Sequence, residues 1–275
     1  MSIWISLLLG IVQGATEFLP VSSSGHLAIL SHLLDVEEMR GNLLFDVLLH
    51  VGTLGAVFAA FYKDIAEVCV GFFSLFSAGK RKSEQGRPAR RLLLLLILAT
   101  VPLIIAVFFE RYVGVLADNL LFVGAALIVT GLLLYIADRI KPGRKNEKTA
   151  LVSDAAVVGL MQVVAVIPGL SRSGSTISTG LMRGFDRKFA VKFSFLMSIP
   201  AVMGATLLEL RKAFSEGVAA EEFLIFLPGM LAAGVVGYFA IVLIKKLADA
   251  GRFGVFAYYC AAVGLVTAAM AIFKP

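Results

Sequence analysis

Long apolar stretches dominate the chain and give the first prediction. Six of them are long enough to cross hydrocarbon as helices, which takes about 20 residues each. They run roughly over 43–62, 92–110, 119–137, 189–210, 223–245 and 253–273. A shorter apolar stretch, 65–78, is expected to lie as a helix at the membrane interface. The pattern predicts an all-α integral membrane protein with six transmembrane helices, built as one polytopic domain over residues 1–275.

Two further apolar stretches are broken in the middle by proline and small polar residues. One covers 3–34 and is interrupted at 20–25, and the other covers 151–182 and is interrupted at 168–174. Backbone groups without partners are costly in hydrocarbon, so such breaks survive only inside protein or beside a wet cavity. We therefore expect two re-entrant helix–loop–helix hairpins in addition to the six spans.

The two broken stretches also resemble each other. Glycine, glutamine and the Ser-x-Ser-Gly order recur, pairing Gly10, Gln13, Ser22, Ser24 and Gly25 with Gly159, Gln162, Ser171, Ser173 and Gly174. Each stretch is followed by three predicted spans, which puts repeat 1 at about 1–140 and repeat 2 at about 150–275. An odd number of spans per repeat turns the second copy upside down. The sequence thus predicts an inverted-topology repeat whose hairpin tips meet near the midplane of the bilayer.

Composition and charge support the membrane assignment. The chain is 59% hydrophobic and only 16% charged, whereas soluble domains have about 25% charged residues. The net charge of +6 comes from basic residues in 63–91, 139–148, 183–192 and 245–252, which the predicted spans place on one face. Such a bias marks the cytoplasmic side, so both termini are expected outside the cytoplasm, and no nucleic-acid partner is needed. The run 80–91 is expected to be a solvated loop near anionic lipid head groups.

The first break carries residues that are unusual inside a membrane. Gln13 and Glu17 are four positions apart and share a helix face. A lone carboxylate is costly in apolar surroundings, so Glu17 should have a cation, a metal or a proton as partner. Serines 22–24 follow, and His26 opens the second half-helix, where it could act as base or nucleophile. Taken singly, the serines could be a helix cap and Glu17 or His26 structural, but their clustering at a helix break favours a functional site.

The second break has the chemistry of an anion site. Hydroxyls and backbone N–H groups at a helix N-terminus favour phosphate oxygens, and Ser171, Ser173 and Thr176 lie there. Arg172 adds a planar fork that suits phosphate. The alternative is that Arg172 pairs with Glu17 and holds the hairpins together, and both roles are compatible in the empty protein.

Three other polar residues lie within or near apolar stretches. His50 is inside the first predicted span and either lines the cavity or bonds across helices, with Asp46 as a candidate partner one turn earlier. His32 is expected at the interface. Asp154 and Glu209 are expected near membrane edges, where charge is tolerated, and are left out of the site. Cys69 and Cys260 both lie in apolar segments, which predicts neither a disulfide nor a metal site for them.

At this point the residues resemble a known family. Gln13-x-x-x-Glu17, Pro20-Val-Ser-Ser-Ser-Gly-His26 and Pro168-Gly-Leu-Ser-Arg-Ser-Gly-Ser-Thr176 resemble the signatures of the undecaprenyl-diphosphate phosphatase family, the bacitracin-resistance proteins. The resemblance covers essentially the whole chain. It implies hydrolysis of undecaprenyl diphosphate to the monophosphate and inorganic phosphate, which recycles the lipid carrier of cell-wall synthesis and confers bacitracin resistance.

The resemblance also implies site residues and a cofactor. The family's acidic residue falls on Glu17, its serine on Ser23, its histidine on His26 and its arginine on Arg172. It implies a divalent cation, Mg²⁺ or Ca²⁺, with Glu17 as metal ligand, and an active site open to the extracytoplasmic side of the plasma (inner) membrane. Many members have Glu where this chain has Gln13, and Gln supplies no charge to a cation.

These residues suggest a mechanism with open alternatives. Arg172 with the serines at 22, 24, 171 and 173 and with Thr176 would bind the phosphates, and Gln13 and His50 would support the site. Ser23 is the preferred nucleophile with His26 as its base, and direct attack by His26 is the competitor. A lipid-phosphate flippase with the same fold is the alternative function, and a lipid-binding scaffold is a weaker one. The expected partners are the polyprenyl diphosphate, membrane lipids and, as an open alternative, a second copy of the chain.

Overall fold

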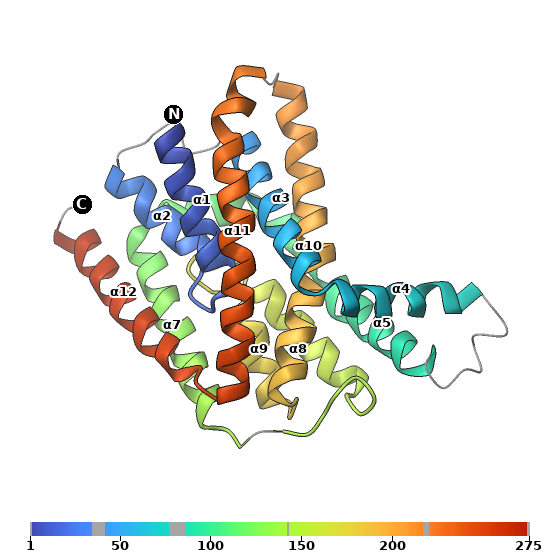
Figure 1. Ribbon diagram of the computed structural model, residues 1–275. Helices are drawn as coiled ribbons and strands as arrows, with labels where there is room; N and C mark the ends of the chain where they lie inside the picture. Colours follow the sequence, from blue (N-terminus) through green and yellow to red (C-terminus); the bar gives the residue numbers. More distant parts are fainter. Residues whose placement is uncertain (1, 35–41, 77–85, 142, 217–219, 274–275) are drawn as a thin grey trace.

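The computed structural model describes residues 2–34, 42–76, 86–141, 143–216 and 220–273, and the regular elements in these ranges are helices (Figure 1). The first half contains α1 (Ile3–Phe18), α2 (Ser23–Leu34), α3 (Leu43–Ala60), α4 (Tyr62–Phe76), α5 (Gly86–Thr100), the 3-10 helix η3 (Val101–Phe109), α6 (Glu110–Ala117) and α7 (Leu120–Arg139). The second half contains α8 (Val152–Val164), α9 (Arg172–Met182), α10 (Arg187–Glu216), α11 (Ala220–Ala250) and α12 (Gly254–Phe273).

The long apolar helices lie at the places of the predicted spans, and five of the six predicted spans are single long helical segments in the described residues. Among the described residues, five helical segments are long and apolar enough to cross a membrane: Arg87–Ala106, Leu120–Arg139, Arg187–Arg211, Glu222–Ala250 and Gly254–Phe273. A sixth is reached if α3 and α4 count as one span, although they are bent by 84° at Phe61. The predicted first span therefore ends near its expected limit, and the predicted interfacial stretch is the separate helix α4. The chain is an all-α, multi-pass membrane protein.

The predictions around the second span need correction. The stretch 92–110 was expected to be one continuous helix, but α5 starts earlier and gives way to η3 at Val101. Pro102 has no N–H to donate to the α-helical ladder, which favours the change. Residues 80–85 of the expected solvated loop lie outside the described residues, but Arg87, Arg90 and Arg91 are in the helix. Arginine is a good helix former, and Arg91 donates to the Ala150 carbonyl at 2.7 Å.

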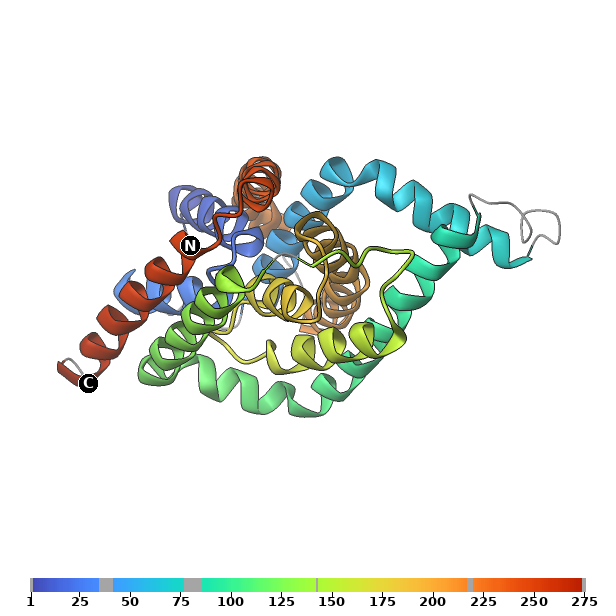
Figure 2. The same cartoon turned by 90° about the horizontal axis from the view of Figure 1, so that it is seen from below.

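Two broken helix pairs occupy the predicted positions. Leu19, between α1 and Pro20, has an extended conformation with ψ 143°, because a following proline disfavours helical backbone. In the second pair Pro168 and Gly169, the latter with a φ of 91°, form the connection between α8 and α9. The two pairs approach the middle of the molecule from opposite ends (Figure 1), and α9 lies enclosed by its neighbours (Figure 2). The breaks are thus placed where their polar residues can meet.

Small residues allow each pair to pack closely on the opposite half of the chain. A Cβ added at Gly10 of α1 would lie 2.1 Å from the Gly229 carbonyl oxygen of α11. The matching Gly159 of α8 packs closely on α5 in the same way, and a Cβ there would lie 2.4 Å from the Ala99 oxygen. Close contact between helix backbones is typical of membrane proteins, because burial of apolar surface does little to drive helices together in lipid. These contacts fix the first helix of each pair.

A buried charge network joins the start of α8 to the end of α9, at the end of the second pair opposite its break. Asp154, at the start of α8, is fully buried and accepts hydrogen bonds from Lys145 Nζ at 2.7 Å and from Arg183 Nε at 2.9 Å. Burial raises the pKa of this carboxyl, but the bonds from Lys145, from the Leu151 N–H and from Arg183 lower it by more, so the pKa is below its usual value. Asp154, expected only at a membrane edge, is therefore a structural anchor.

Asp154→Ala should lower the free energy of unfolding by about 3 kcal/mol, because it leaves two cations without their buried partner. The contribution is present above the pKa of the unfolded aspartate, about 3.9, and is lost as the pH falls through the lower pKa of the folded state. Thermal unfolding in detergent measures both effects. The control is Asp249→Ala, which removes an exposed ion pair with Lys188 and should cost less than about 1 kcal/mol. Equal losses for the two variants would contradict the account.

Candidate active site

The tips of the two helix pairs are joined by an ion pair. Arg172, the first residue of α9, donates from a guanidinium nitrogen to Glu17 Oε1, near the end of α1. A second contact runs from Ser173 Oγ to the Leu19 carbonyl at 3.3 Å. The Glu17 side chain is only 8% exposed and that of Arg172 21%. The predicted meeting of Glu17 and Arg172 is present, and each charge has the partner that burial requires.

The remaining Glu17 oxygen is shared by the other candidates of the first break. Ser23 Oγ donates to Glu17 Oε2 at 2.6 Å, and Gln13 Nε2 donates to the same oxygen at 3.1 Å. The hydrogen bond to Glu17 sets the orientation of the Gln13 amide, so its Oε1 points away from that oxygen. This Oε1 is buried and has no hydrogen-bond partner in the described structure. Glu17 therefore holds a serine hydroxyl at a distance suited to proton transfer.

The turn between α1 and α2 is strained at Ser22. Its φ is +71°, a conformation that costs non-glycine residues free energy and persists only where surrounding contacts enforce it. Ser22 Oγ accepts from the Gly25 N–H and lies 3.3 Å from Ser24 Oγ, and the Ser22 carbonyl accepts from the His26 N–H at 3.2 Å. The first-break serines thus shape the turn, and Ser23 is the one that faces Glu17.

His26 is oriented away from Ser23. Its Nδ1 lies 2.8 Å from the Ser22 carbonyl oxygen, and its Nε2 lies 2.8 Å from the Tyr259 hydroxyl of α12. In the part of the chain that the structure describes, no hydrogen bond joins Ser23 and His26. In the described structure the Ser23 hydroxyl therefore bonds Glu17 and not His26, and the base role expected of His26 stays a prediction.

The second-break hydroxyls are buried and already hydrogen-bonded. Ser171 Oγ caps α9 by accepting from the Gly174 N–H at 3.0 Å, and it lies 3.2 Å from Ser173 Oγ. Thr176 Oγ1 donates to the Arg172 carbonyl at 2.8 Å and lies 2.6 Å from Ser194 Oγ. The exposed fractions of Ser171, Ser173 and Thr176 are 1%, 3% and 1%. These hydroxyls organise the start of α9, and their predicted contact with phosphate stays a prediction.

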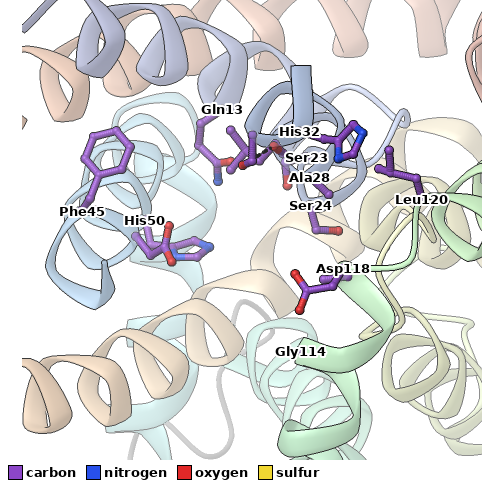
Figure 3. A pocket seen from close by; sticks show the side chains of 14 residues that line it. Gln13, Ser23, Ser24, Ala28, His32, Phe45, His50, Gly114, Asp118 and Leu120 are labelled. Carbon is purple, nitrogen blue, oxygen red and sulfur yellow. Dashed lines mark hydrogen bonds between the residues drawn. The ribbon is translucent and has the colours of Figure 1, made fainter. Parts of the chain in front are cut away.

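A cavity of about 560 Å³ opens beside the helix tips (Figure 3). Gln13 and Ser23 line it together with residues from α2, α3, α6 and α7: Ser24, Leu27, Ala28, Ser31, His32, Phe45, Asp46, His50, Gly114, Ala117, Asp118 and Leu120. The polar lining and the volume suit a charged head group. Ser23, whose hydroxyl bonds Glu17, is therefore at the wall of this space.

Several cavity residues were assigned otherwise or missed by sequence reasoning. His50 does line the cavity, and its Nδ1 lies 3.8 Å from Glu209 Oε2 of α10, which had been set aside as an edge residue. His32 also lines the cavity, and its expected position at the interface stays a prediction. Asp118, between α6 and α7, faces the space from the side opposite Gln13 (Figure 3) and was not singled out. A single acidic residue between two apolar segments is typical of a loop, so no local pattern marked it.

The donor set at the tips suits a hard divalent cation only with help from a ligand. Among the residues that the structure describes, no group of three or more His, Cys, Asp and Glu side chains could hold a metal ion. Mg²⁺ is commonly held by one or two protein oxygens, with water and substrate phosphates completing the shell. The Glu17 carboxylate and Gln13 Oε1, which has no hydrogen-bond partner in the described structure, are oxygens of that kind on two side chains that contact each other.

Comparison with known proteins places the chain in a family. The family model described as "Bacitracin resistance protein BacA" matches residues 6–266. A protein named undecaprenyl-diphosphatase from Alkaliphilus metalliredigens is 42% identical over 272 residues, 97% of this chain and 98% of the relative. Proteins of the same name from Methanosphaera stadtmanae and Treponema denticola are 38% and 40% identical, over 97% and 96% of this chain and 97% and 96% of their own lengths. Because the match spans nearly all helices and both breaks, the chain belongs to the bacitracin resistance protein BacA family.

Proposed function

We propose that this chain hydrolyses undecaprenyl diphosphate to undecaprenyl phosphate and inorganic phosphate. The observation that carries the proposal is the joined tip site, in which Ser23, Glu17 and Arg172 meet beside the polar cavity. The names of its relatives, undecaprenyl-diphosphatase, identify the substrate and the reaction. The product would return to cell-wall synthesis as lipid carrier, and removal of the diphosphate accounts for bacitracin resistance.

The proposed setting is the plasma (inner) membrane, with the two helix pairs as re-entrant hairpins of an inverted repeat. In this arrangement α1 and α2 enter from the extracytoplasmic face, and the cavity beside them opens there. The Lys145 and Arg183 side chains at the open end of α8 and α9 are on the opposite, basic face, which the positive-inside rule assigns to the cytoplasm. The prenyl chain would leave the cavity sideways between helices into lipid.

In the proposed reaction the diphosphate draws Arg172 from Glu17 onto its terminal phosphate. Ser23 Oγ attacks the terminal phosphorus, and its proton passes to Glu17 Oε2, which already accepts its hydrogen bond. The bond from phosphorus to the bridging oxygen breaks, and undecaprenyl phosphate leaves with the electron pair. Water then attacks the phosphoserine, Ser23 regains its proton and inorganic phosphate is released. Arg172 and the N–H groups at the start of α9 stabilise the equatorial oxygens throughout.

Glu17 and Gln13 Oε1 are the oxygens proposed to hold Mg²⁺ or Ca²⁺ together with the substrate. When bound, the cation would offset negative charge on the diphosphate. Glu17 also accepts the Ser23 proton. The role proposed for Gln13 is therefore to supply a second oxygen, Oε1, to the cation.

Gln13→Ala should therefore raise the cation concentration needed for half-maximal phosphate release, by about tenfold. Gln13→Glu should lower it, because a second carboxylate attracts the cation more strongly. The measurement is phosphate release by purified protein over a titration of Mg²⁺ after treatment with chelator. If both variants follow the wild-type titration curve, Gln13 has no part in holding the cation.

The proposed activity is tested by incubating purified protein in detergent with farnesyl diphosphate. We expect inorganic phosphate and farnesyl phosphate in equal amounts, and loss of release on addition of chelator. A lipid-phosphate flippase would release neither product, and the names of the relatives do not favour that alternative. Absence of phosphate release from folded protein with Mg²⁺ or Ca²⁺ present would refute the proposal.

A further inference from the structure

Helix α12 contacts the turn of the first helix pair through two consecutive residues. Tyr259 hydrogen-bonds His26 through its hydroxyl at 2.8 Å, and Cys260 Sγ lies 3.5 Å from the Pro20 carbonyl oxygen. Tyr259 and His26 are far apart in sequence, and their rings are stacked with an interplanar angle of 3° and centroids 5.7 Å apart. The contact joins the last helix to the residue that follows the reactive serine by three positions.

The hydrogen bonds of His26 fix which nitrogen carries its proton. A carbonyl oxygen only accepts, so the Nδ1 facing Ser22 must be the N–H nitrogen of the ring. In the neutral imidazole, Nε2 is then an acceptor, and the Tyr259 hydroxyl donates to it. The Ser22 carbonyl thereby selects the tautomer, and the Tyr259 hydroxyl, which bonds the second nitrogen, helps to fix the orientation of the ring.

The same chain of contacts ends at the strained residue of the turn. The Ser22 carbonyl accepts from both the His26 N–H, at 3.2 Å, and His26 Nδ1, at 2.8 Å. Since a φ of +71° persists at a serine only under such constraint, the His26 ring is one of the groups that hold the turn. Ser23, the next residue, has its hydroxyl 2.6 Å from Glu17 Oε2.

We propose that Tyr259 is a positioning residue for the reaction: through His26 it fixes the Ser22 carbonyl and so keeps the Ser23 hydroxyl directed at Glu17. This inference rests on the proposed phosphatase function. Among the described residues Tyr259 does not line the cavity, and its hydrogen bond and ring contact are with His26, so its effect passes through His26.

The chain offers a matched control one residue away. Tyr258 is on the same helix, but its ring packs edge-on against Tyr135 of α7 at 6.4 Å between centroids. Tyr259→Phe and Tyr258→Phe each remove one hydroxyl oxygen from α12, and only the first removes a hydrogen bond to His26. Tyr259→Phe should lower kcat for farnesyl diphosphate about five- to tenfold, the effect of one lost hydrogen bond, with little change in KM. Tyr258→Phe should match the wild type.

A double-mutant comparison separates positioning from general loss of stability. In a His26→Ala background, Tyr259→Phe should change kcat by less than about twofold, because the residue it acts through is gone. The contact itself is read by ¹⁵N NMR of histidine-labelled protein, which has only three histidines. The His26 Nε2 resonance should move in Tyr259→Phe and stay in Tyr258→Phe.

An unchanged kcat in Tyr259→Phe would overturn the proposal even if the resonance moves. So would an unmoved resonance, or an equal fall in kcat with and without His26, because the effect would not pass through that ring. A wild-type protein that releases no phosphate would instead refute the proposed function, while the Nε2 resonance would still decide whether Tyr259 orients His26.

Discussion

Ser23→Ala should abolish measurable phosphate release, with kcat reduced by at least about 10³-fold, the scale seen when a nucleophile is removed. The hydroxyl is the group that Glu17 holds at 2.6 Å beside the cavity, and alanine leaves no atom to attack phosphorus. The fold should be kept, because Ser23 is the first residue of α2 and its side chain is half-buried. The measurement is phosphate release from farnesyl diphosphate, with thermal unfolding recorded for the same preparation.

The control for this prediction is Ser74→Ala. Ser74 is a buried serine of α4 whose hydroxyl bonds the Gly71 carbonyl at 2.7 Å, away from the helix tips. It should keep wild-type turnover. If Ser23→Ala kept more than about a tenth of the wild-type kcat, a residual rate that removing a true nucleophile does not leave, Ser23 could not be the nucleophile, and direct attack by His26 would become the leading mechanism.

Arg172→Ala should lower kcat/KM by about 10³-fold, the contribution of an arginine that stabilises a transferring phosphoryl group. It should also destabilise the protein, because Glu17 is left buried without its cation, and such a loss costs about 3–5 kcal/mol. Arg172→Lys keeps the charge but not the planar fork, so it should recover most of the stability and little of the activity. Kinetics measured below the unfolding temperature of each variant separate the two effects.

Arg183→Ala is the contrasting case. Arg183 pairs with buried Asp154 at the other end of α9, with 2.8 Å between its terminal guanidinium nitrogen and Asp154 Oδ1. Its loss should reduce stability while leaving kcat/KM near the wild-type value at temperatures where the variant is folded. An Arg172→Ala protein with wild-type kcat/KM would reduce Arg172 to the structural pairing role.

The sequence predicts the broken helices because their causes are local, and it predicts their meeting because each break carries a charge that needs a partner. Proline at position 20 and the Pro168-Gly169 pair interrupt apolar stretches that would otherwise continue as helices. A buried carboxylate and a buried guanidinium in two such breaks each need a partner, so their pairing follows from the cost of lone charges. Glu17 and Arg172 were therefore identifiable without coordinates.

The side-chain contacts that could not be predicted depend on which helices pack against each other. Tyr259 is a single tyrosine in an apolar span, and only the packing of α12 brings its hydroxyl to His26. Ser194 likewise meets Thr176 across α10 and α9. His26 was expected to act as the base of Ser23, but its ring turns back to the carbonyl four residues earlier. Side-chain direction at a helix start is set by such local acceptors, which spacing alone does not reveal.

The most direct test of the joined tip site is phosphate release by the wild type, Ser23→Ala and Arg172→Ala in the same detergent, each below its unfolding temperature. The account predicts release of phosphate and of the prenyl monophosphate by the wild type, and almost none by either variant. Equal release by all three folded proteins would contradict it, because the chemistry would then occur away from the two helix tips.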